Sequence, residues 1–208
     1  MIIGIDFDNT IISYDMAFHK IALSRKLITC DDKVRISKEA VREFLVFSGK
    51  EKEWTELQGY VYGKEIFSAK PYEGVLEVID DLLQKNHSVH IISHKTQFPY
   101  LGPKYDLHQS AKNWIEQFFC DGKEMSKHTK LTVTFNKTIE EKINCIKEKQ
   151  CEIFIDDLLT VFNHPSFPQN LMKILFKPSP RSRFQYQTDL NVIDSWKTIG
   201  QVLSNDFV

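Results

Sequence analysis

The stretch IIGIDFDNT, which spans residues 2–10, decides the fold that this sequence predicts. Its first half is apolar and β-branched apart from Gly4, which suits a parallel strand buried on both faces. The stretch becomes polar at Asp6 and again at residues 8–10, where a strand would leave its sheet and enter a loop. It therefore predicts a buried strand whose carboxyl end carries acidic side chains.

Strand and helix patterns alternate along much of the remaining sequence. Short apolar runs typical of buried strands lie at residues 89–92, 131–135, 152–155 and 173–176. Apolar residues recur at helical spacing at residues 75–83, 106–119 and 139–149. Strands that alternate with helices predict an α/β fold, here a doubly wound parallel sheet with right-handed crossovers.

A helical insertion is predicted between the first strand and the rest of the sheet. From about residue 14 to residue 62 no strand pattern occurs, and apolar residues recur at helical spacing instead. Pro71 and Gly74 mark the return to the core. We therefore expect a core domain of residues 1–13 and 70–208 and a small helical cap of residues 14–69.

Acidic and hydroxyl side chains lie at or just past the ends of the predicted strands. They are Asp6, Asp8, Ser93, Asp156 and Asp157. Because the reacting groups of a parallel sheet gather at the carboxyl ends of its strands, we expect these side chains to converge. Converging carboxylates repel one another unless a counter-charge is present, and a hard divalent cation with oxygen ligands supplies one. Magnesium is the cofactor that this pattern predicts.

Such a set of groups suits phosphoryl transfer, which depends on positioning and charge neutralisation. One aspartate can attack phosphorus and carry the phosphoryl group as a phosphoaspartate. A second aspartate at a loop exit can protonate the leaving oxygen and later activate water.

On these residues the chain resembles the haloacid dehalogenase (HAD) superfamily, and within it the phosphatases. Residues 6–10, DFDNT, are similar to the DxDxT motif that follows the first strand in that family. Ser93 matches the second motif, and Asp156 with Asp157 matches the fourth. The presence of Asp8 argues against a dehalogenase, whose chemistry lacks this second acidic group.

The resemblance implies a role for each of these side chains. Asp6 would be the nucleophile and a metal ligand, and Asp8 the general acid and base, with its backbone carbonyl also on the metal. The Ser93 hydroxyl would hydrogen-bond the transferred phosphoryl group. Asp156 would bind Mg²⁺ directly, and Asp157 would do so directly or through water.

The third motif of the family is a lysine that precedes the last of these strands, and the sequence offers two candidates. We favour Lys142, which lies fourteen positions before Asp156, near the start of a predicted helix. Lys137, in the loop before that helix, is the alternative.

Three further residues are candidates for contact with the substrate phosphate. Thr10 ends the DxDxT-like motif, and His94 and Lys95 directly follow Ser93. The place of the insertion matches the C1-type caps of the family, which implies a small phosphorylated metabolite as substrate. A phosphotransferase of the same fold, or a non-catalytic regulatory or binding protein, is the alternative function.

The charge balance, the cysteine content and the lack of long apolar stretches indicate which binding partners and which cellular location to expect. The 208 residues contain 27 Lys and Arg against 28 Asp and Glu, a net charge of -1. This balance gives no long-range attraction to a polyanion, so we expect no nucleic-acid partner. The four cysteines form no CxxC pair, which favours reduced thiols, and no long apolar stretch predicts a membrane span. We therefore expect a cytoplasmic protein.

Overall fold

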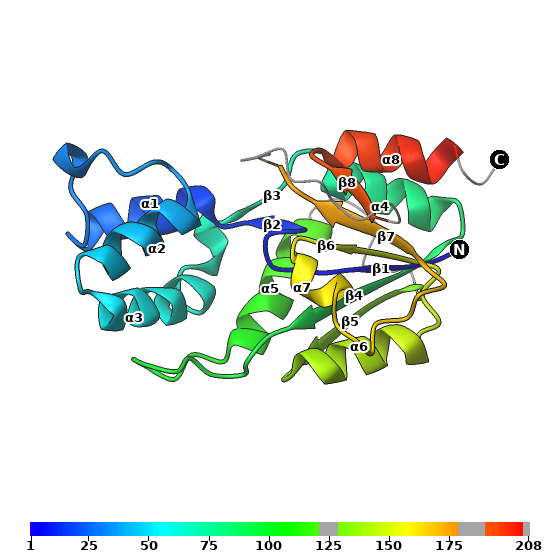
Figure 1. The fold of residues 1–208 in the computed structure, drawn as a ribbon. Coiled ribbons are helices and arrows are strands. Elements are labelled where there is room, and N and C mark those ends of the chain that lie inside the picture. Colours follow the sequence, from blue (N-terminus) through cyan, green and yellow to red (C-terminus); the bar gives the residue numbers. More distant parts are fainter. Residues whose placement is uncertain (121–128, 179–189, 206–208) are drawn as a thin grey trace. The chain divides into compact units, whose positions relative to one another are not determined.

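In the computed structural model, which describes residues 1–120, 129–178 and 190–205, six strands form one parallel sheet in the order β5-β4-β1-β6-β7-β8 (Figure 1). The strands are β1 (Ile2–Ile5), β4 (Ser88–His94), β5 (Leu131–Asn136), β6 (Ile153–Asp156), β7 (Met172–Phe176) and β8 (Leu190–Ile193). The chain builds outward from β1 to β5, crosses back to β6 and then builds outward to β8. The predicted α/β fold with a parallel sheet and a helical insertion is confirmed.

Helices lie between these strands and, in the case of α8, after the last of them. They are α1 (Asp15–Ser24), α2 (Lys38–Phe47), α3 (Glu51–Tyr62), α4 (Val75–Gln84), α5 (Leu107–Cys120), α6 (Ile139–Glu148), α7 (Leu159–Phe162) and α8 (Trp196–Asn205). Two short 3-10 helices span Cys30–Asp32 and Ile66–Ser68, and β2 (Ile12–Ser13) pairs with β3 (Lys70–Pro71) in a separate small sheet. None of the helices in the described ranges combines the length and hydropathy that a bilayer crossing requires.

Two of these elements lie beyond the last predicted strand. Apolar patterning predicts no element after residue 176, whereas the structure has both β8 and α8 there. The reason is visible in β8, which is four residues long with an exposed Asn191 and Val192. Such a short edge strand shows neither a continuous apolar run nor a clear alternation.

The register of the central strands decides which side chains share a face of the sheet. Gly4 of β1 lies opposite Phe154 of β6, and Ile5 lies opposite Ile155. Because side chains alternate along a strand, the next position after Gly4 on the same face is that of Asp6. Helices α4 and α8 cover one face of the sheet and α6 the other (Figure 1).

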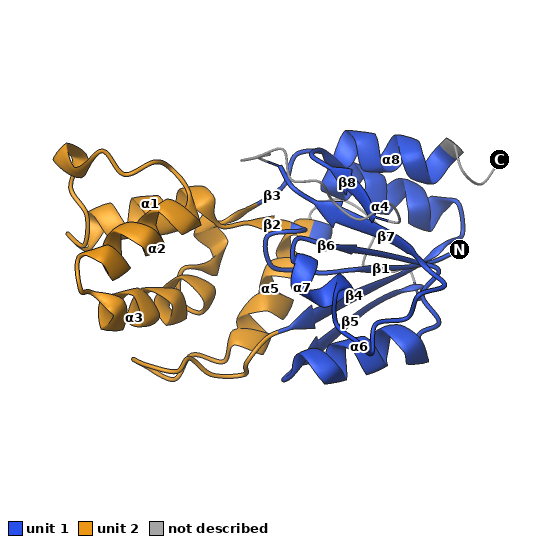
Figure 2. Cartoon of the chain, viewed as in Figure 1, with its two compact units in different colours: residues 1–11, 71–94, 119–208 blue, residues 12–70, 95–118 orange. Residues whose placement is uncertain are grey.

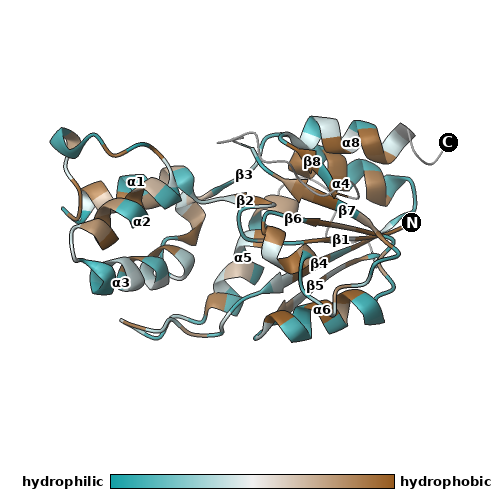
Figure 3. Ribbon diagram, viewed as in Figure 1, coloured by the Kyte–Doolittle hydropathy of each residue, from teal (hydrophilic) through white to brown (hydrophobic). Residues whose placement is uncertain are grey.

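The apolar surfaces of these elements form the core. The central strands are coloured as hydrophobic along most of their length, whereas the helices show both hydrophobic and hydrophilic residues (Figure 3). In α4 the buried positions are Val75, Ile79, Leu82 and Leu83, which follow a helical repeat. Burial of these surfaces is the main term that stabilises the sheet and its helices together.

The chain divides into two compact units (Figure 2). The core unit consists of residues 1–11, 71–94 and 119–208, and the insertion unit consists of residues 12–70 and 95–118. The predicted cap, residues 14–69, thus has residues 95–118 beside it in the same unit. The reason is close packing on α3, because a Cβ added at Gly59 would lie 2.6 Å from Pro99.

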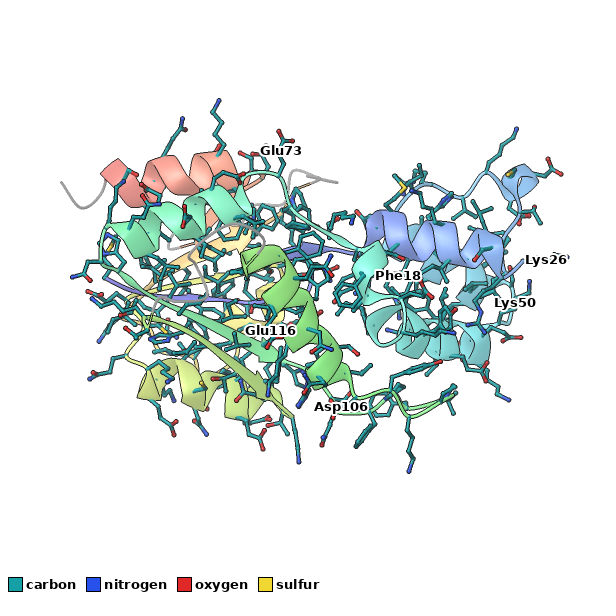
Figure 4. All side chains as sticks on the ribbon, turned by 180° about the vertical axis from the view of Figure 1, so that it is seen from behind. Phe18, Lys26, Lys50, Glu73, Asp106 and Glu116 are labelled. Carbon is teal, nitrogen blue, oxygen red and sulfur yellow. The ribbon has the colours of Figure 1, made fainter. Side chains whose placement is uncertain are left out.

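Aromatic rings fill the interior of the insertion unit. The ring of Phe18, labelled in Figure 4, lies 5.1 Å from that of Trp54 and 5.5 Å from that of Tyr62. Tyr14 contacts both Phe18 and Tyr62 edge to face. Phe18 and Trp54, which the sequence placed at helical positions, therefore serve packing in this unit.

Gly4→Ala is expected to destabilise the core unit. A Cβ at this position would lie 2.5 Å from a ring carbon of Phe154 and 2.9 Å from Sγ of Cys151. Overpacking of this kind costs about 1–3 kcal/mol, which urea denaturation measures as a lower midpoint at an unchanged slope. In the Gly4→Ala, Phe154→Leu double variant the obstructing ring is gone, so its loss should be smaller than the sum of the single losses. A Gly4→Ala chain as stable as wild type contradicts the close contact.

Candidate active site

Asp6 stands where β1 leaves the sheet. Its backbone N–H donates a hydrogen bond to the carbonyl oxygen of Ile155 at 2.9 Å, so the pairing with β6 continues to this residue. Asp156 ends β6 on the same face of the sheet. Both side chains are buried, with exposed fractions of 5% for Asp6 and 0% for Asp156. Two carboxyl groups thus lie together in the protein interior.

A third carboxyl group joins them from the residue after β6. Asp6, Asp156 and half-buried Asp157 each offer an oxygen atom, and these three atoms lie within 4.8 Å of one another. Asp8, the fourth carboxylate of the predicted set, is half-buried and lies outside this group of three. Its charge nevertheless acts on Asp6, whose pKa it raises. The residues at the ends of β1 and β6 therefore form an acidic group.

Lys142 reaches this group from the first turn of α6. The helix begins after Thr138, whose hydroxyl accepts a hydrogen bond from the backbone N–H of Glu141 at 3.1 Å. The ammonium Nζ of Lys142 lies 2.6 Å from Oδ1 of Asp6 and 2.6 Å from Oδ2 of Asp156. With an exposed fraction of 1%, Lys142 is a buried cation held between two carboxylates.

The alternative lysine lies elsewhere in the core unit. Lys137 is exposed, its backbone N–H donates to Oε2 of Glu141, and its carbonyl oxygen accepts a hydrogen bond from Nε2 of His94 at 3.0 Å. Of the two candidate lysines, Lys142 is the one whose ammonium contacts the acidic residues.

Burial and neighbouring charges determine the pKa values of Asp6 and Lys142. Burial raises the pKa of Asp6 to about 7, Asp156 and Asp8 add to this shift, and Lys142 opposes it. Burial alone would lower the pKa of Lys142, but the charges of Asp156 and Asp6 outweigh it and raise that pKa above its ordinary value. Lys142 is therefore a permanent cation, and one ammonium faces three clustered carboxyl groups.

The donor set fits a magnesium ion. Its side-chain ligand atoms are carboxylate oxygens of Asp6, Asp156 and Asp157, and hard oxygen donors are what Mg²⁺ prefers. An excess of carboxylates over ammonium also calls for a further positive charge. These three residues would hold the ion, which when bound supplies charge neutralisation for an incoming phosphate.

Among the described residues of the core unit, two hydroxyl groups are buried without a hydrogen-bond partner. They are Oγ1 of Thr10 and Oγ of Ser93, with exposed fractions of 0% and 1%. A buried polar group that lacks a partner costs about 1–3 kcal/mol. Thr10 lies in the loop that follows β1. Ser93 lies near the carboxyl end of β4, the strand that pairs with β1. Each of these hydroxyls therefore retains an unused capacity to donate a hydrogen bond.

The other two predicted substrate residues have different surroundings. His94 is exposed and its ring donates to the carbonyl oxygen of Lys137. Lys95 is buried in the insertion unit, where its Nζ lies 4.7 Å from the centre of the Tyr62 ring. A role for either in substrate binding stays a prediction.

Two residues that sequence patterns did not single out also touch the motifs. Nζ of Lys177 donates to the backbone carbonyl of Asp157, and Nε1 of Trp196 donates to the backbone carbonyl of Thr10 at 2.9 Å. Lys177 directly follows β7, so the strand-end rule could have pointed to it. Trp196 begins α8, which no apolar pattern predicted, and no sequence signal marks its contact.

Comparison with known proteins identifies the fold. No protein-family model and no curated protein matches the sequence. Solved structures do match, among them a HAD-superfamily hydrolase from Ehrlichia chaffeensis, with a TM-score of 0.54, 14% identity and coverage of 97% of this chain and 95% of that one. A predicted phosphatase from Clostridium acetobutylicum has a TM-score of 0.59 and 14% identity, with 98% and 97% of the two chains covered.

A third match carries a metal. A HAD-hydrolase candidate from Bacillus subtilis, solved with bound magnesium, has a TM-score of 0.59 and 10% identity and covers 97% of each chain. All three agree over nearly their full lengths. The chain has the fold of the HAD superfamily, and the Asp6, Asp156 and Asp157 group lies at the carboxyl ends of β1 and β6 in that fold.

Lys142→Met is expected to destabilise the protein strongly. The substitution keeps the length of the side chain but leaves two buried carboxylates without their shared cation, which costs about 3–5 kcal/mol. Lys137→Met, the matched control, removes an exposed charge and should change the free energy of unfolding by no more than about 0.5 kcal/mol. Denaturant unfolding of both variants checks this, and equal stabilities for the two would contradict the geometry.

Proposed function

We propose that this protein is a magnesium-dependent phosphatase that hydrolyses the phosphate monoester of a small metabolite through an aspartyl-phosphate on Asp6. The observation that carries the proposal is the buried Lys142 ammonium between Asp6 and Asp156, with Asp157 beside them. Cations arranged around a carboxylate nucleophile are what a phosphoryl group needs, because its charge must be balanced as it is transferred. The fold shared with a predicted phosphatase and with a magnesium-bound structure supports the same assignment.

The first step forms the covalent intermediate. A carboxylate oxygen of Asp6 attacks phosphorus, and the bond from phosphorus to the ester oxygen breaks. Asp8 donates its proton to that departing oxygen, so the alcohol leaves neutral. Asp8 suits this task because it is half-buried and two residues from Asp6, in the loop that follows β1.

The second step releases phosphate. Asp8, now a carboxylate, takes a proton from a water molecule while the water oxygen attacks phosphorus. The bond between phosphorus and the Asp6 oxygen breaks, inorganic phosphate leaves, and both aspartates return to their starting states. A different acceptor in place of water would give a phosphotransferase, so the fate of the phosphoryl group separates these two activities.

Three residues hold the phosphoryl oxygens in this proposal. Lys142 supplies a fixed positive charge, which its raised pKa keeps in place. The hydroxyls of Ser93 and Thr10 donate hydrogen bonds, and their buried, unsatisfied state leaves both free to do so. Groups oriented in advance towards developing charge lose little energy in reorganising during the reaction.

The class of substrate follows from the modest size of the insertion. Between β1 and α4 the chain adds three α-helices and short 3-10 and strand segments. An insertion of this size suits a small phosphorylated metabolite as the substrate.

Hydrolysis of para-nitrophenyl phosphate should require added Mg²⁺ and stop when a chelator is added. The reason is that the acidic group needs a divalent counter-charge before it can accept an anion. Release of nitrophenolate, followed by absorbance, is the measurement. Full activity after exhaustive chelation would exclude the metal assignment.

Asp6→Asn is the matched variant for the nucleophile. It keeps the shape of the side chain and removes the attacking carboxylate, so activity should fall to background while the circular dichroism spectrum stays that of wild type. Retained turnover in purified Asp6→Asn protein would place the nucleophile on another residue.

Ser93→Ala is expected to lower the rate of turnover without lowering the stability of the protein. Because the Ser93 hydroxyl has no partner, its removal should leave the free energy of unfolding unchanged or raise it by up to about 1 kcal/mol. Turnover should fall by about 10²-fold, the effect of losing one donor to developing charge.

Ser37→Ala is the control with the opposite pattern. Ser37 caps α2, where its Oγ accepts a hydrogen bond from the backbone N–H of Ala40 at 3.0 Å. Its replacement should cost about 1 kcal/mol and leave turnover unchanged. If both serine variants lose stability and keep their activity, the Ser93 hydroxyl has no part in catalysis.

A further inference from the structure

The backbone that carries the Thr10 hydroxyl is a tight turn after β1. Ile11 N–H donates to the carbonyl oxygen of Phe7 at 3.0 Å, and Asn9 adopts a left-handed conformation with φ of 58°. Asparagine adopts this conformation more readily than most residues, so the turn causes little backbone strain. These local contacts close the turn but leave the carbonyl groups of Thr10 and Ile11 to find partners elsewhere.

Two consecutive carbonyl groups of this turn are held from outside it. The indole Nε1 of Trp196 donates to the Thr10 oxygen at 2.9 Å. The backbone N–H of Tyr72 donates to the Ile11 oxygen, also at 2.9 Å. The turn is thereby fixed at the very residue whose hydroxyl is buried and unsatisfied.

The two donors belong to one set of packed rings, which we call the aromatic brace: Tyr72, Phe176 and Trp196. The ring centre of Phe176 lies 4.9 Å from that of Tyr72, edge to face, and 5.9 Å from that of Trp196. Trp196 has an exposed fraction of 1%. The brace joins the start of α8 and the end of β7 to the segment before α4, so three distant parts of the core unit support one turn.

We infer that Trp196 is a positioning residue for phosphoryl transfer: through the Thr10 carbonyl it orients the Thr10 hydroxyl towards the transferring phosphoryl group. This inference rests on the proposed phosphatase function. A hydroxyl can serve a reacting group only if its backbone holds it in one place, and a shift of about 1 Å can cost 10²-fold in rate. The indole N–H supplies this restraint from 186 residues away in the sequence.

Trp196→Phe tests the inference because it keeps a ring and deletes the N–H donor. Trp114→Phe is its matched control. Trp114 has an exposed fraction of 0%, and its Nε1 donates to the carbonyl oxygen of Ala69 at 3.0 Å within the insertion unit. Both variants lose one buried indole–carbonyl hydrogen bond, so a purely structural role predicts the same result for both. We expect kcat/KM for para-nitrophenyl phosphate to fall at least about tenfold in Trp196→Phe only.

A double-mutant cycle shows whether Trp196 acts through Thr10. Thr10→Val removes the hydroxyl and keeps the shape of the side chain. In that background Trp196→Phe should reduce kcat/KM by less than about twofold, because the group it positions is already gone. Independent, multiplicative losses from the two substitutions would overturn the inference. Affinity for inorganic phosphate, measured by calorimetry in the presence of Mg²⁺, should show the same non-additivity.

A second variant covers the case in which Trp196→Phe does not fold. Site-specific replacement of Trp196 by 3-benzothienylalanine keeps the size of the bicyclic ring and substitutes sulfur for the N–H. A folded chain with wild-type kcat/KM would overturn the inference, whereas a loss of about tenfold or more supports it. If the wild-type protein itself hydrolyses no ester with Mg²⁺ present, the proposed function fails and the inference falls with it. Active wild type with equal results for the Trp196 and Trp114 variants overturns the inference alone.

Discussion

The contact of the Lys142 ammonium with Asp6 and Asp156 is the interaction on which the rest of the site depends. Charges removed from water are costly, and these are tolerated because each lies within hydrogen-bond distance of an opposite charge. The requirement constrains the fold, since β1, β6 and the first turn of α6 must meet at one point. The crossover from β5 through α6 to β6 brings them there. Folding of the core unit therefore brings Lys142, Asp6 and Asp156 together.

Strand register turns that requirement into side-chain chemistry. Gly4 lies opposite Phe154, so the ring occupies space that a side chain at position 4 would fill, and Nζ of Lys142 lies 5.4 Å from the centre of that ring. Further along the same face come Asp6 and Asp156. A slip of one residue in either strand would turn its aspartate to the opposite face. The apolar contact at Gly4 and the acidic contact at Asp6 are therefore two results of one alignment.

The sequence predicted the sheet, the helical insertion and the convergence of Asp6, Asp156 and Asp157, because a buried strand with a polar end is a local pattern. It left two lysines open, since Lys137 and Lys142 differ in burial, and burial depends on the packed chain. The place of Lys177 just after β7 could have marked it as a candidate, but its bond to the Asp157 carbonyl, like that of Trp196 to the Thr10 carbonyl, could not be predicted from the sequence. Each joins a side chain to a distant backbone carbonyl, a bond that has no periodicity in sequence.

Residues 95–118 belong to the same compact unit as the helical insertion, so this unit is not built from one continuous segment. An inserted domain that consists of one continuous segment can be exchanged between related proteins as a whole. Here the loop and helix after β4 supply Pro99 against Gly59, and Trp114 hydrogen-bonds Ala69. The unit is discontinuous, because its second segment lies between β4 and β5 in the sequence. Residues 12–70 moved alone into another protein would lack part of the interior of the insertion unit, so residues 95–118 are expected to vary together with residues 12–70.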